Sequence, residues 1–264
     1  MSTADLIYFS PTATTRKIIE EIAKGFGAVS PGHVNLTPPE SKQGTLPAIR
    51  GEVAFIGMPV YAGRLPSEAV SRFKRINGMG IPAVVVVVYG NRAFDDALIE
   101  LRDIAMDAGF RPIAAGAFIG EHSFSTDEIK LSYHRPDPDD LRQAVHFGKL
   151  ISQKMGVLPS VTDIPVLNVP GNHPYLESRL PKDAAPVSQS FCTCCQECAT
   201  VCPTGAISLR GNAMTTDVSQ CILCSACVKS CTTGARMLLD ERIQKLRGML
   251  AAKFSQRKEP ETFF

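Results

Sequence analysis

The first 155 residues of the chain carry two different periods of apolar and polar positions. Short runs at residues 4–9, 33–36, 52–58, 83–90 and 112–120 are typical of strands. The run at 83–90 contains five consecutive valines, which indicates a strand buried on both faces, as in the centre of a parallel sheet. Residues 14–26 instead show helical spacing, with one apolar face formed by Ile18, Ile19, Ile22, Ala23 and Phe26.

Further helices are expected at residues 67–76, 94–108 and 139–155, so strands and helices alternate. Five strands separated by helices predict an α/β fold with an open parallel sheet. In such a sheet a ligand lies at the carboxyl ends of the strands, where the strand order reverses. The loops at 10–15, 59–65 and 90–94 leave three strands at this edge, so we expect the functional residues of residues 1–155 there.

The segment 156–190 differs from what precedes it, because it is rich in proline. Proline at this density disfavours helix and favours an extended connector. We expect a linker over 156–190 that runs along the surface of the first domain, then a cysteine-rich domain over 191–240 and a helix with a tail over 241–264. The prolines of the linker are Pro159, Pro165, Pro170, Pro174, Pro181 and Pro186.

Charge and composition restrict the classes of function. The formal net charge of the 264 residues is +2, and nothing in this balance indicates nucleic-acid binding. The N-terminus lacks a basic stretch followed by a long apolar run, and the longest apolar run, 83–89, is too short to cross a bilayer. We therefore expect a cytoplasmic protein without a membrane span; the sequence leaves the oligomeric state open.

The nine cysteines all lie after residue 191, in two segments that repeat each other at an offset of 29 residues. Each segment has the spacing C-x2-C-x2-C-x3-C, which is that of bacterial iron–sulfur ligation, where the fourth cysteine completes the other cluster. Two separated C-x2-C pairs, the usual zinc pattern, do not describe it. The spacing predicts one [4Fe-4S] cluster on Cys192, Cys195, Cys198 and Cys231, and a second on Cys221, Cys224, Cys227 and Cys202.

Residues 190–240 resemble the bacterial two-[4Fe-4S] ferredoxins, a resemblance that implies a small α+β domain. Proline follows the last cysteine of the first motif as in those ferredoxins, but Thr232 takes its place in the second. Cys194 has no counterpart in the repeat. It is either a bystander near the first cluster or a redox-active thiol.

The loop 8-YFSPTATTRK-17 places four hydroxyls between a strand and a helix. Hydroxyls and free backbone N–H groups at a helix start form an anion site. Arg16 and Lys17 lie in the first helical turn, where the helix dipole disfavours cations and a bound phosphate would offset this. The alternative is simple N-capping by Thr12 or Thr14. Neither a G-x-G-x-x-G nor a G-x-x-x-x-G-K-[ST] motif is present.

This strand–loop–helix arrangement resembles the flavodoxins, over residues 1–155. Ser10, Thr12, Thr14 and Thr15 fall on the hydroxyl and amide positions of their phosphate loop, and Ala13 replaces the usual glycine. The resemblance implies bound FMN and a five-stranded parallel sheet in the order 2-1-3-4-5.

The resemblance also implies that the loops 59–66 and 89–96 flank the isoalloxazine ring. Tyr61 would be the aromatic beside the ring, although ordinary packing is its alternative. Since the chain has no tryptophan, Phe94 or another domain would cover the second face. The remaining implied contacts are Pro59 and Val60, Ala62 and Gly63 near flavin N5, and Tyr89, Gly90, Asn91 and Arg92 towards the pyrimidine edge.

The whole chain looks like the flavodoxin–ferredoxin fusion proteins of anaerobic prokaryotes. The resemblance implies an electron-transfer protein that relays electrons between FMN and two clusters, and so links one- and two-electron redox protein partners. One alternative is an FMN-dependent reductase with an anion pocket of Arg64, Arg92 and His122. Another is a redox sensor or assembly factor with structural clusters. No nicotinamide site is recognisable.

The C-terminal residues 240–264 have apolar residues at helical spacing, namely Ile243, Leu246, Leu250 and Phe254. They predict a helix that packs on the ferredoxin-like domain, or whose basic face docks an acidic electron partner. A further hypothesis is that Phe263 and Phe264 cap an apolar cleft near the flavin.

Overall fold

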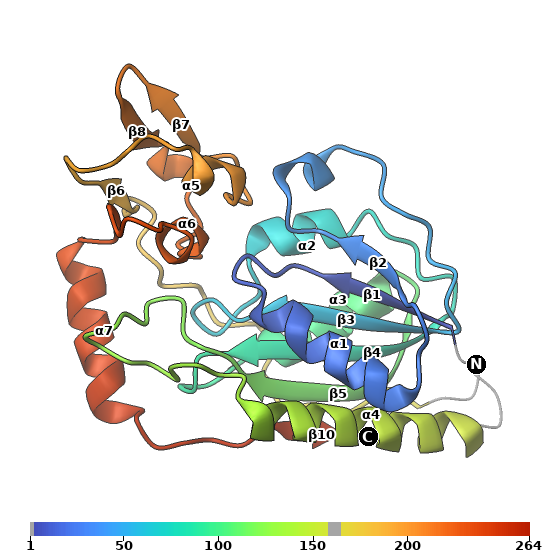
Figure 1. The fold of residues 1–264 in the computed structure, drawn as a ribbon. Coiled ribbons are helices and arrows are strands. Elements are labelled where there is room, and N and C mark those ends of the chain that lie inside the picture. The colour runs from blue at the N-terminus through green and yellow to red at the C-terminus, as the bar shows by residue number, and fades with distance from the viewer. Residues whose placement is uncertain (1–2, 158–164) are drawn as a thin grey trace.

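The computed structural model describes residues 3–157 and 165–264. An α/β domain lies beside a smaller cysteine-rich domain (Figure 1). The central sheet has the order β10-β5-β4-β3-β1-β2, so the predicted parallel order 2-1-3-4-5 is confirmed and one antiparallel strand is added at the β5 edge. This is the strand order of flavodoxin-like folds. The strands are β1 (Ala4–Tyr8), β2 (Gly32–Asn35), β3 (Val53–Pro59), β4 (Pro82–Tyr89), β5 (Arg111–Ile119) and β10 (Glu261–Phe263).

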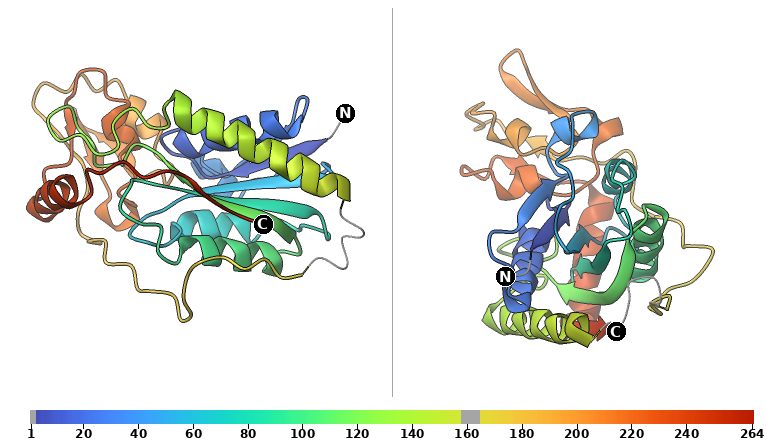
Figure 2. Two further views of the ribbon diagram at one scale, coloured as in Figure 1. Left: turned by 90° about the horizontal axis from the view of Figure 1, so that it is seen from below. Right: turned by 90° about the vertical axis from the view of Figure 1, so that its right-hand side faces the viewer.

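Helices cover both faces of this sheet (Figure 2). α1 (Thr14–Phe26) and α4 (Pro138–Val157) pack on one face, and α2 (Ser67–Phe73) and α3 (Ala97–Asp107) on the other. The valines of β4 alternate between the two cores: Val84, Val86 and Val88 join the α1 side, and Val85 and Val87 the opposite side. The five-valine run is therefore buried on both faces, as its sequence indicates. A short 3-10 helix, η1 (Pro39–Lys42), follows β2.

The proline-rich segment lies along α3. Asp96 accepts hydrogen bonds from the backbone N–H groups of Asn172 (2.9 Å) and Leu176 (2.7 Å). Leu167 and Val169 are buried in the core on the α3 side. Residues 167–176 therefore lie on the first domain, whereas Val187 and Ser188, at the end of the segment, pair with residues of the cysteine-rich domain. Residues 158–164 lie outside the described residues.

The cysteine-rich domain repeats itself in its backbone as well as in its sequence. Left-handed backbone conformations recur at the same offset in three pairs: Cys194 and Leu223, Gln196 and Ser225, and Gly205 and Gly234. Each half therefore folds in the same way around its cysteines. The elements are β6 (Val187–Ser188), α5 (Glu197–Thr200), β7 (Ile207–Arg210), β8 (Ala213–Thr216), η3 (Val218–Gln220), α6 (Ala226–Lys229) and β9 (Arg236–Met237), with β6 paired to β9 and β7 to β8.

The C-terminal helix α7 (Glu241–Lys253) packs its apolar face as expected. Ile243 and Leu250 are buried against Leu223 of the cysteine-rich domain and against Phe124 and Leu131 of the loop after β5. The helix thus contacts both domains. Its apolar face is accounted for by packing.

The hypothesis that Phe263 and Phe264 cap a cleft near the flavin is wrong. β10 pairs antiparallel with β5, which places Phe263 opposite Ala115 in the middle of that strand. The Phe264 ring lies 5.4 Å from the Phe147 ring on α4, between ring centroids. Without β10, the edge strand β5 would expose unpaired backbone N–H and C=O groups. Pairing with β5 gives these groups, and those of the tail, hydrogen-bond partners.

Candidate functional site

The loop between β1 and α1 has the features of an anion site. α1 begins after Ala13, whose φ is 62°, the left-handed conformation that a glycine adopts more easily. Within the described residues neither Thr12 nor Thr14 caps this helix, so the alternative of N-capping by either residue is wrong. The hydroxyl oxygens of Thr12 and Thr14 lie 3.4 Å apart. Ser10 Oγ accepts a hydrogen bond from the Arg16 N–H at 3.0 Å and so shapes the loop.

A hollow of about 410 Å³ opens in front of this loop. Lys17 lines the hollow, and its Nζ donates a hydrogen bond to the Pro136 carbonyl oxygen at 3.3 Å. Thr15 Oγ1 is buried and has no hydrogen-bond partner among the described residues. A phosphate group fits this combination of hydroxyls and cations. The lining residues are Thr12, Ala13, Thr14, Arg16, Lys17, Glu20, His134, Arg135 and Pro136.

A second, smaller cavity of about 40 Å³ joins all three predicted loops. It brings together the predicted residues Thr12, Thr14, Pro59, Val60, Tyr61, Tyr89 and Gly90. The segment 121–125 follows β5 at the same edge of the sheet. From the sequence, Glu121 and His122 are either contacts to a substrate or flavin or, as the favoured alternative, an exposed loop pair; in the structure both line this cavity. The additional lining residues are Val88, Gly120, Glu121, His122 and Ser123.

His122 occupies the space in which a flavin ring would have to lie. Its imidazole packs on Gly90, where an added Cβ would come within 2.3 Å of the His122 ring. Its Nδ1 accepts a hydrogen bond from the Phe124 N–H at 3.0 Å. Burial, together with the charges of Lys229, Arg247 and Arg92, lowers the pKa of His122 to about 4. With the His122 side chain in this position, the cavity of about 40 Å³ has no room for an isoalloxazine ring.

Tyr61 begins a tight turn at the carboxyl end of β3. Its N–H donates to the Arg64 carbonyl oxygen at 2.8 Å, and the two central residues, Ala62 and Gly63, have φ values of 51° and 80°. Burial raises the pKa of Tyr61 well above its usual range, and the charge of Cys224 in the cysteine-rich domain raises it further. The loop that Tyr61 begins is therefore near a predicted cluster ligand.

Three of the predicted flavin contacts are engaged elsewhere through their side chains. Asn91 Nδ2 donates to the carbonyl oxygens of Phe254 (2.8 Å) and Gln256 (2.7 Å) in the tail. Arg92 pairs with Asp95. Phe94 is buried in the core, with its ring 5.5 Å from that of Tyr89, so it does not cover an open face of the cavity.

The anion pocket of Arg64, Arg92 and His122 is not assembled, since only His122 lines the cavity. Arg64 Nε instead pairs with Glu100 at 2.8 Å, and its guanidinium lies 4.7 Å from the centroid of the Tyr175 ring. Arg64 therefore fastens the linker to α3. The pattern of the sequence contained no signal for this contact.

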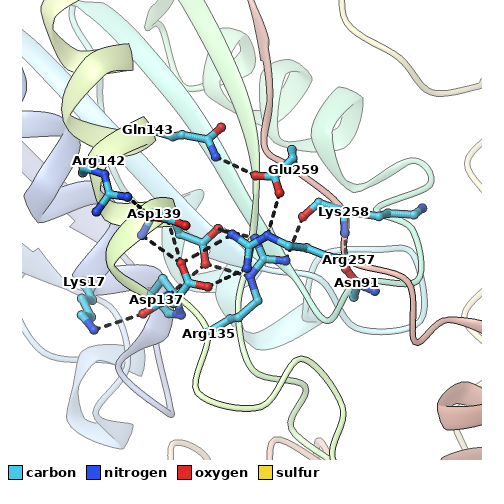
Figure 3. A network of polar contacts seen from close by, with 12 residues as sticks. Lys17, Asn91, Arg135, Asp137, Asp139, Arg142, Gln143, Arg257, Lys258 and Glu259 are labelled. Carbon is cyan, nitrogen blue, oxygen red and sulfur yellow. Dashed lines mark hydrogen bonds and ion pairs between the residues drawn. The ribbon is translucent and has the colours of Figure 1, made fainter.

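A polar network holds the tail between α7 and β10 beside the hollow in front of the β1–α1 loop (Figure 3). Arg135, which is 7% exposed, donates to Asp140 from Nε at 2.7 Å and to the Lys258 carbonyl oxygen at 2.8 Å. Arg257 pairs with Asp137 at 2.6 Å. The tail is thereby held against both Asn91 and the start of α4.

Four cysteines surround one cavity inside the cysteine-rich domain. Its lining includes Cys202, Cys221, Cys224 and Cys227, the set that the spacing predicts for the second cluster. Burial raises the pKa of the Cys224 thiol, and the charges of Cys227, Cys202 and Cys221 raise it further, as expected of thiols held close together. The donor chemistry and the enclosure fit an iron–sulfur cluster.

The other predicted set is more open. Cys198 is buried, Cys192 is half-buried and Cys195 is exposed, and the charges of Cys192 and Cys195 both act on Cys198. Cys231 repeats a contact of its counterpart: Cys231 Sγ lies 3.5 Å from Thr233 Oγ1, and Cys202 Sγ lies 3.5 Å from Thr204 Oγ1. That Cys231 completes this set remains a prediction from the repeat.

Within residues 3–157 and 165–264, no three Cys, His, Asp or Glu side chains form a group that could hold a single metal ion. A [4Fe-4S] cluster needs a wider arrangement of thiolates than a single ion does, because each thiolate binds a different iron atom of the cluster. Cys194 Sγ donates to the Asn212 carbonyl oxygen at 3.3 Å, away from its neighbours, while its N–H lies 3.5 Å from Cys192 Sγ.

The cysteine-rich domain is attached to the flavin edge of the sheet. Arg72 is 1% exposed and donates to the Pro203 carbonyl oxygen at 2.6 Å, next to Cys202. Lys229 on α6 pairs with Glu121 beside the small cavity. These contacts hold the second cysteine set, not the first, against the first domain.

Part of this chain is similar to solved structures. No protein-family model matches the chain, and no curated protein matches it. A flavodoxin from the domain Archaea is similar over 58% of this chain and 99% of its own, with 16% identity and a TM-score of 0.39. A Fusobacterium nucleatum flavodoxin bound to flavin mononucleotide is similar over 58% and 99%, with 18% identity and a TM-score of 0.38. Rubredoxin oxygen:oxidoreductase from the anaerobe Desulfovibrio gigas is similar over 59% and 36%, with 13% identity and a TM-score of 0.41.

Among the described helices, none combines the length and the apolar character needed to cross a membrane.

Proposed function

We propose that this chain is an electron-transfer protein that binds FMN at the sheet edge and two [4Fe-4S] clusters in the cysteine-rich domain. The observation that carries the proposal is the attachment of the second cysteine set to the edge of the sheet where the flavin is expected. Arg72 donates to the Pro203 carbonyl oxygen, next to Cys202, at 2.6 Å, and Lys229 on α6 pairs with Glu121, which lines the small cavity. A cluster held at this edge would be close enough for short-range electron transfer to a flavin bound there.

In this proposal the FMN phosphate lies in the hollow in front of α1. The Thr12, Thr14 and Thr15 hydroxyls and Lys17 would hold it, with the loop shaped by Ser10 and Ala13. The ring would lie between the loops 59–63 and 89–92 after His122 moves. Bound FMN supplies exchange between two-electron and one-electron steps.

The two cysteine sets would have different positions in the relay. Cys224 faces Tyr61 and is buried, whereas Cys195 is exposed. A redox protein partner would therefore exchange electrons at the end that carries Cys192 and Cys195. The second set would stand between that end and the flavin. The donor and the acceptor are unspecified by these contacts.

The positions of two arginines separate this proposal from an FMN-dependent reductase. A reductase with an anion pocket would use Arg64, Arg92 and His122 together, but Arg64 and Arg92 are paired with carboxylates rather than turned to a substrate. These contacts favour electron transfer between proteins. A sensor or assembly factor with structural clusters would show no electron transfer between clusters and flavin.

An anaerobic reductive titration, with iron and flavin assayed on the same sample, tests the proposal. We expect about eight irons and one FMN per chain, with linked bleaching of both chromophores. Cys224→Ser should lose iron and the linkage, whereas Cys194→Ser, a cysteine outside both sets, should retain both. Full iron without any flavin, even with added FMN, would refute the FMN site. Independent bleaching of flavin and clusters would refute the relay.

A further inference from the structure

Arg236 interrupts the internal repeat at a buried position. The offset of 29 residues pairs it with Ile207, which is 7% exposed and packs among apolar side chains. Arg236 is 2% exposed. One half of the repeat thus buries a positive charge where the other half buries a branched apolar side chain.

The guanidinium of Arg236 is only partly satisfied by the chain. Nη1 donates to Ser188 Oγ at 2.9 Å, and Nη2 donates to Thr216 Oγ1. Nε is buried and has no hydrogen-bond partner in the part of the chain that the structure describes. Nor does any carboxylate there pair with Arg236. An unpaired buried charge is strongly unfavourable, so we expect a negatively charged group next to the Arg236 guanidinium.

The available negative partners are the thiolates of both predicted cysteine sets. Thr216, which accepts from Nη2, lines the same cavity as the four cysteines of the second set. The charge of Arg236 also favours the thiolates of Cys227 and Cys221 in that set. In the first set it favours the thiolate of Cys198. Arg236 therefore lies beside the second set, and its charge reaches the first.

We propose that Arg236 is a positioning charge shared by the two clusters, which it holds at a raised reduction potential. The inference rests on the proposed function, because it requires clusters on these cysteines. Reduction of a cluster adds one negative charge, and a fixed positive charge nearby stabilises that form. Burial removes most of the solvent screening, so the effect reaches both clusters.

The test compares Arg236→Gln and Arg236→Lys with wild type in redox titrations of both clusters followed by electron paramagnetic resonance. Arg236→Gln should lower both potentials, by about 59 mV for each tenfold loss in the one-electron reduction equilibrium. Arg236→Lys retains the charge and should stay close to wild type. Arg247→Gln is the matched control, since Arg247 is also buried with an unpartnered Nε but lies on α7. It should leave both cluster potentials unchanged.

Unchanged potentials in an Arg236→Gln protein with full iron would overturn the proposal, as would a shift of one cluster alone. If Arg236→Gln does not retain iron, wild-type protein carrying guanidino-15N-arginine is examined by pulsed paramagnetic resonance. Coupling of 15N to the reduced clusters supports the proposal, and its absence overturns it. A wild-type protein without iron would instead refute the proposed function, and that result is read before any variant is compared.

Discussion

Asn91 and Lys258 are joined by a hydrogen bond that links the loop after β4 to the C-terminal tail, and Lys258 makes a second hydrogen bond to the neighbouring residue Arg92. The Lys258 N–H donates to Asn91 Oδ1 at 3.1 Å, and Lys258 Nζ donates to the carbonyl oxygen of Arg92 at 2.6 Å. Asn91 Nδ2 bonds two further tail carbonyls. The tail therefore fixes a loop that the sequence alone assigns to the cofactor.

Removing this link should loosen the flavin-edge loop. Asn91 is 4% exposed, so Asn91→Ala leaves tail groups unpaired and should cost about 1–3 kcal/mol of folding free energy. FMN should also bind more weakly, because the loop 89–92 loses its support. Thermal unfolding and fluorescence titration with FMN measure the two effects. Asn212→Ala, at an exposed turn, is the control and should change neither. Equal FMN affinity in Asn91→Ala would show that the tail does not organise the loop.

The hydroxyl of Thr14 should contribute to binding of the phosphate and not of the ring. Thr14→Val keeps the shape of the side chain and removes the donor, so FMN affinity should fall about tenfold or more, as for a lost hydrogen bond to a charged group. Riboflavin has the same ring without the phosphate, and its affinity should not change. Fluorescence titration with both ligands checks this. Equal losses for FMN and riboflavin would place Thr14 at the ring instead.

Ala13 provides a test of backbone strain in the same loop. Its φ of 62° is unfavourable for any residue with a Cβ, so Ala13→Gly should stabilise the protein by about 1 kcal/mol. Ala252→Gly, at an exposed position in α7, should instead destabilise it by about 1 kcal/mol. Chemical denaturation of both variants gives the comparison. A loss of stability in Ala13→Gly would show that the left-handed turn is not strained.

His122 should make FMN binding depend on pH. In the closed cavity the pKa of His122 is about 4, and a displaced, solvated imidazole returns to about 6.5. Between these values the displaced form binds a proton that the closed form does not, so FMN binding takes up a proton and strengthens as the pH falls. The gain is at most about tenfold per pH unit.

Isothermal titration at pH 7.5 and at pH 5.5 measures this effect. Riboflavin is included because its ring displaces His122 without the titrating phosphate of FMN. His122→Gln should lose the pH dependence of riboflavin affinity. If the pH dependence is equal in His122→Gln and wild type, His122 is not displaced on binding.

The pattern of residues along the chain was enough to predict the five parallel strands and the edge at which their loops lie. The valine run of β4 and the apolar face of α1 are local patterns of apolar residues. Each pattern repeats with the period of its strand or helix, so the element can be predicted from neighbouring residues alone. The cysteine repeat determined its backbone in the same local way, since left-handed residues recur at Gly205 and Gly234. The loops that follow β1, β3 and β4 meet at one edge because parallel strands place their carboxyl ends together.

The partner of each side chain depends on the folded arrangement of the elements. Asn91 and Phe94 lie in the predicted loop, yet Asn91 bonds the tail and Phe94 enters the core. Segments distant in sequence also meet where β10 pairs with β5, where His122 packs on Gly90 and where Arg72 bonds Pro203. Such contacts depend on how whole elements pack, and no local period records them. For Arg236 both levels are needed. The repeat shows that Arg236 replaces an apolar residue, Ile207, but only the fold brings its charge near both sets of cysteines.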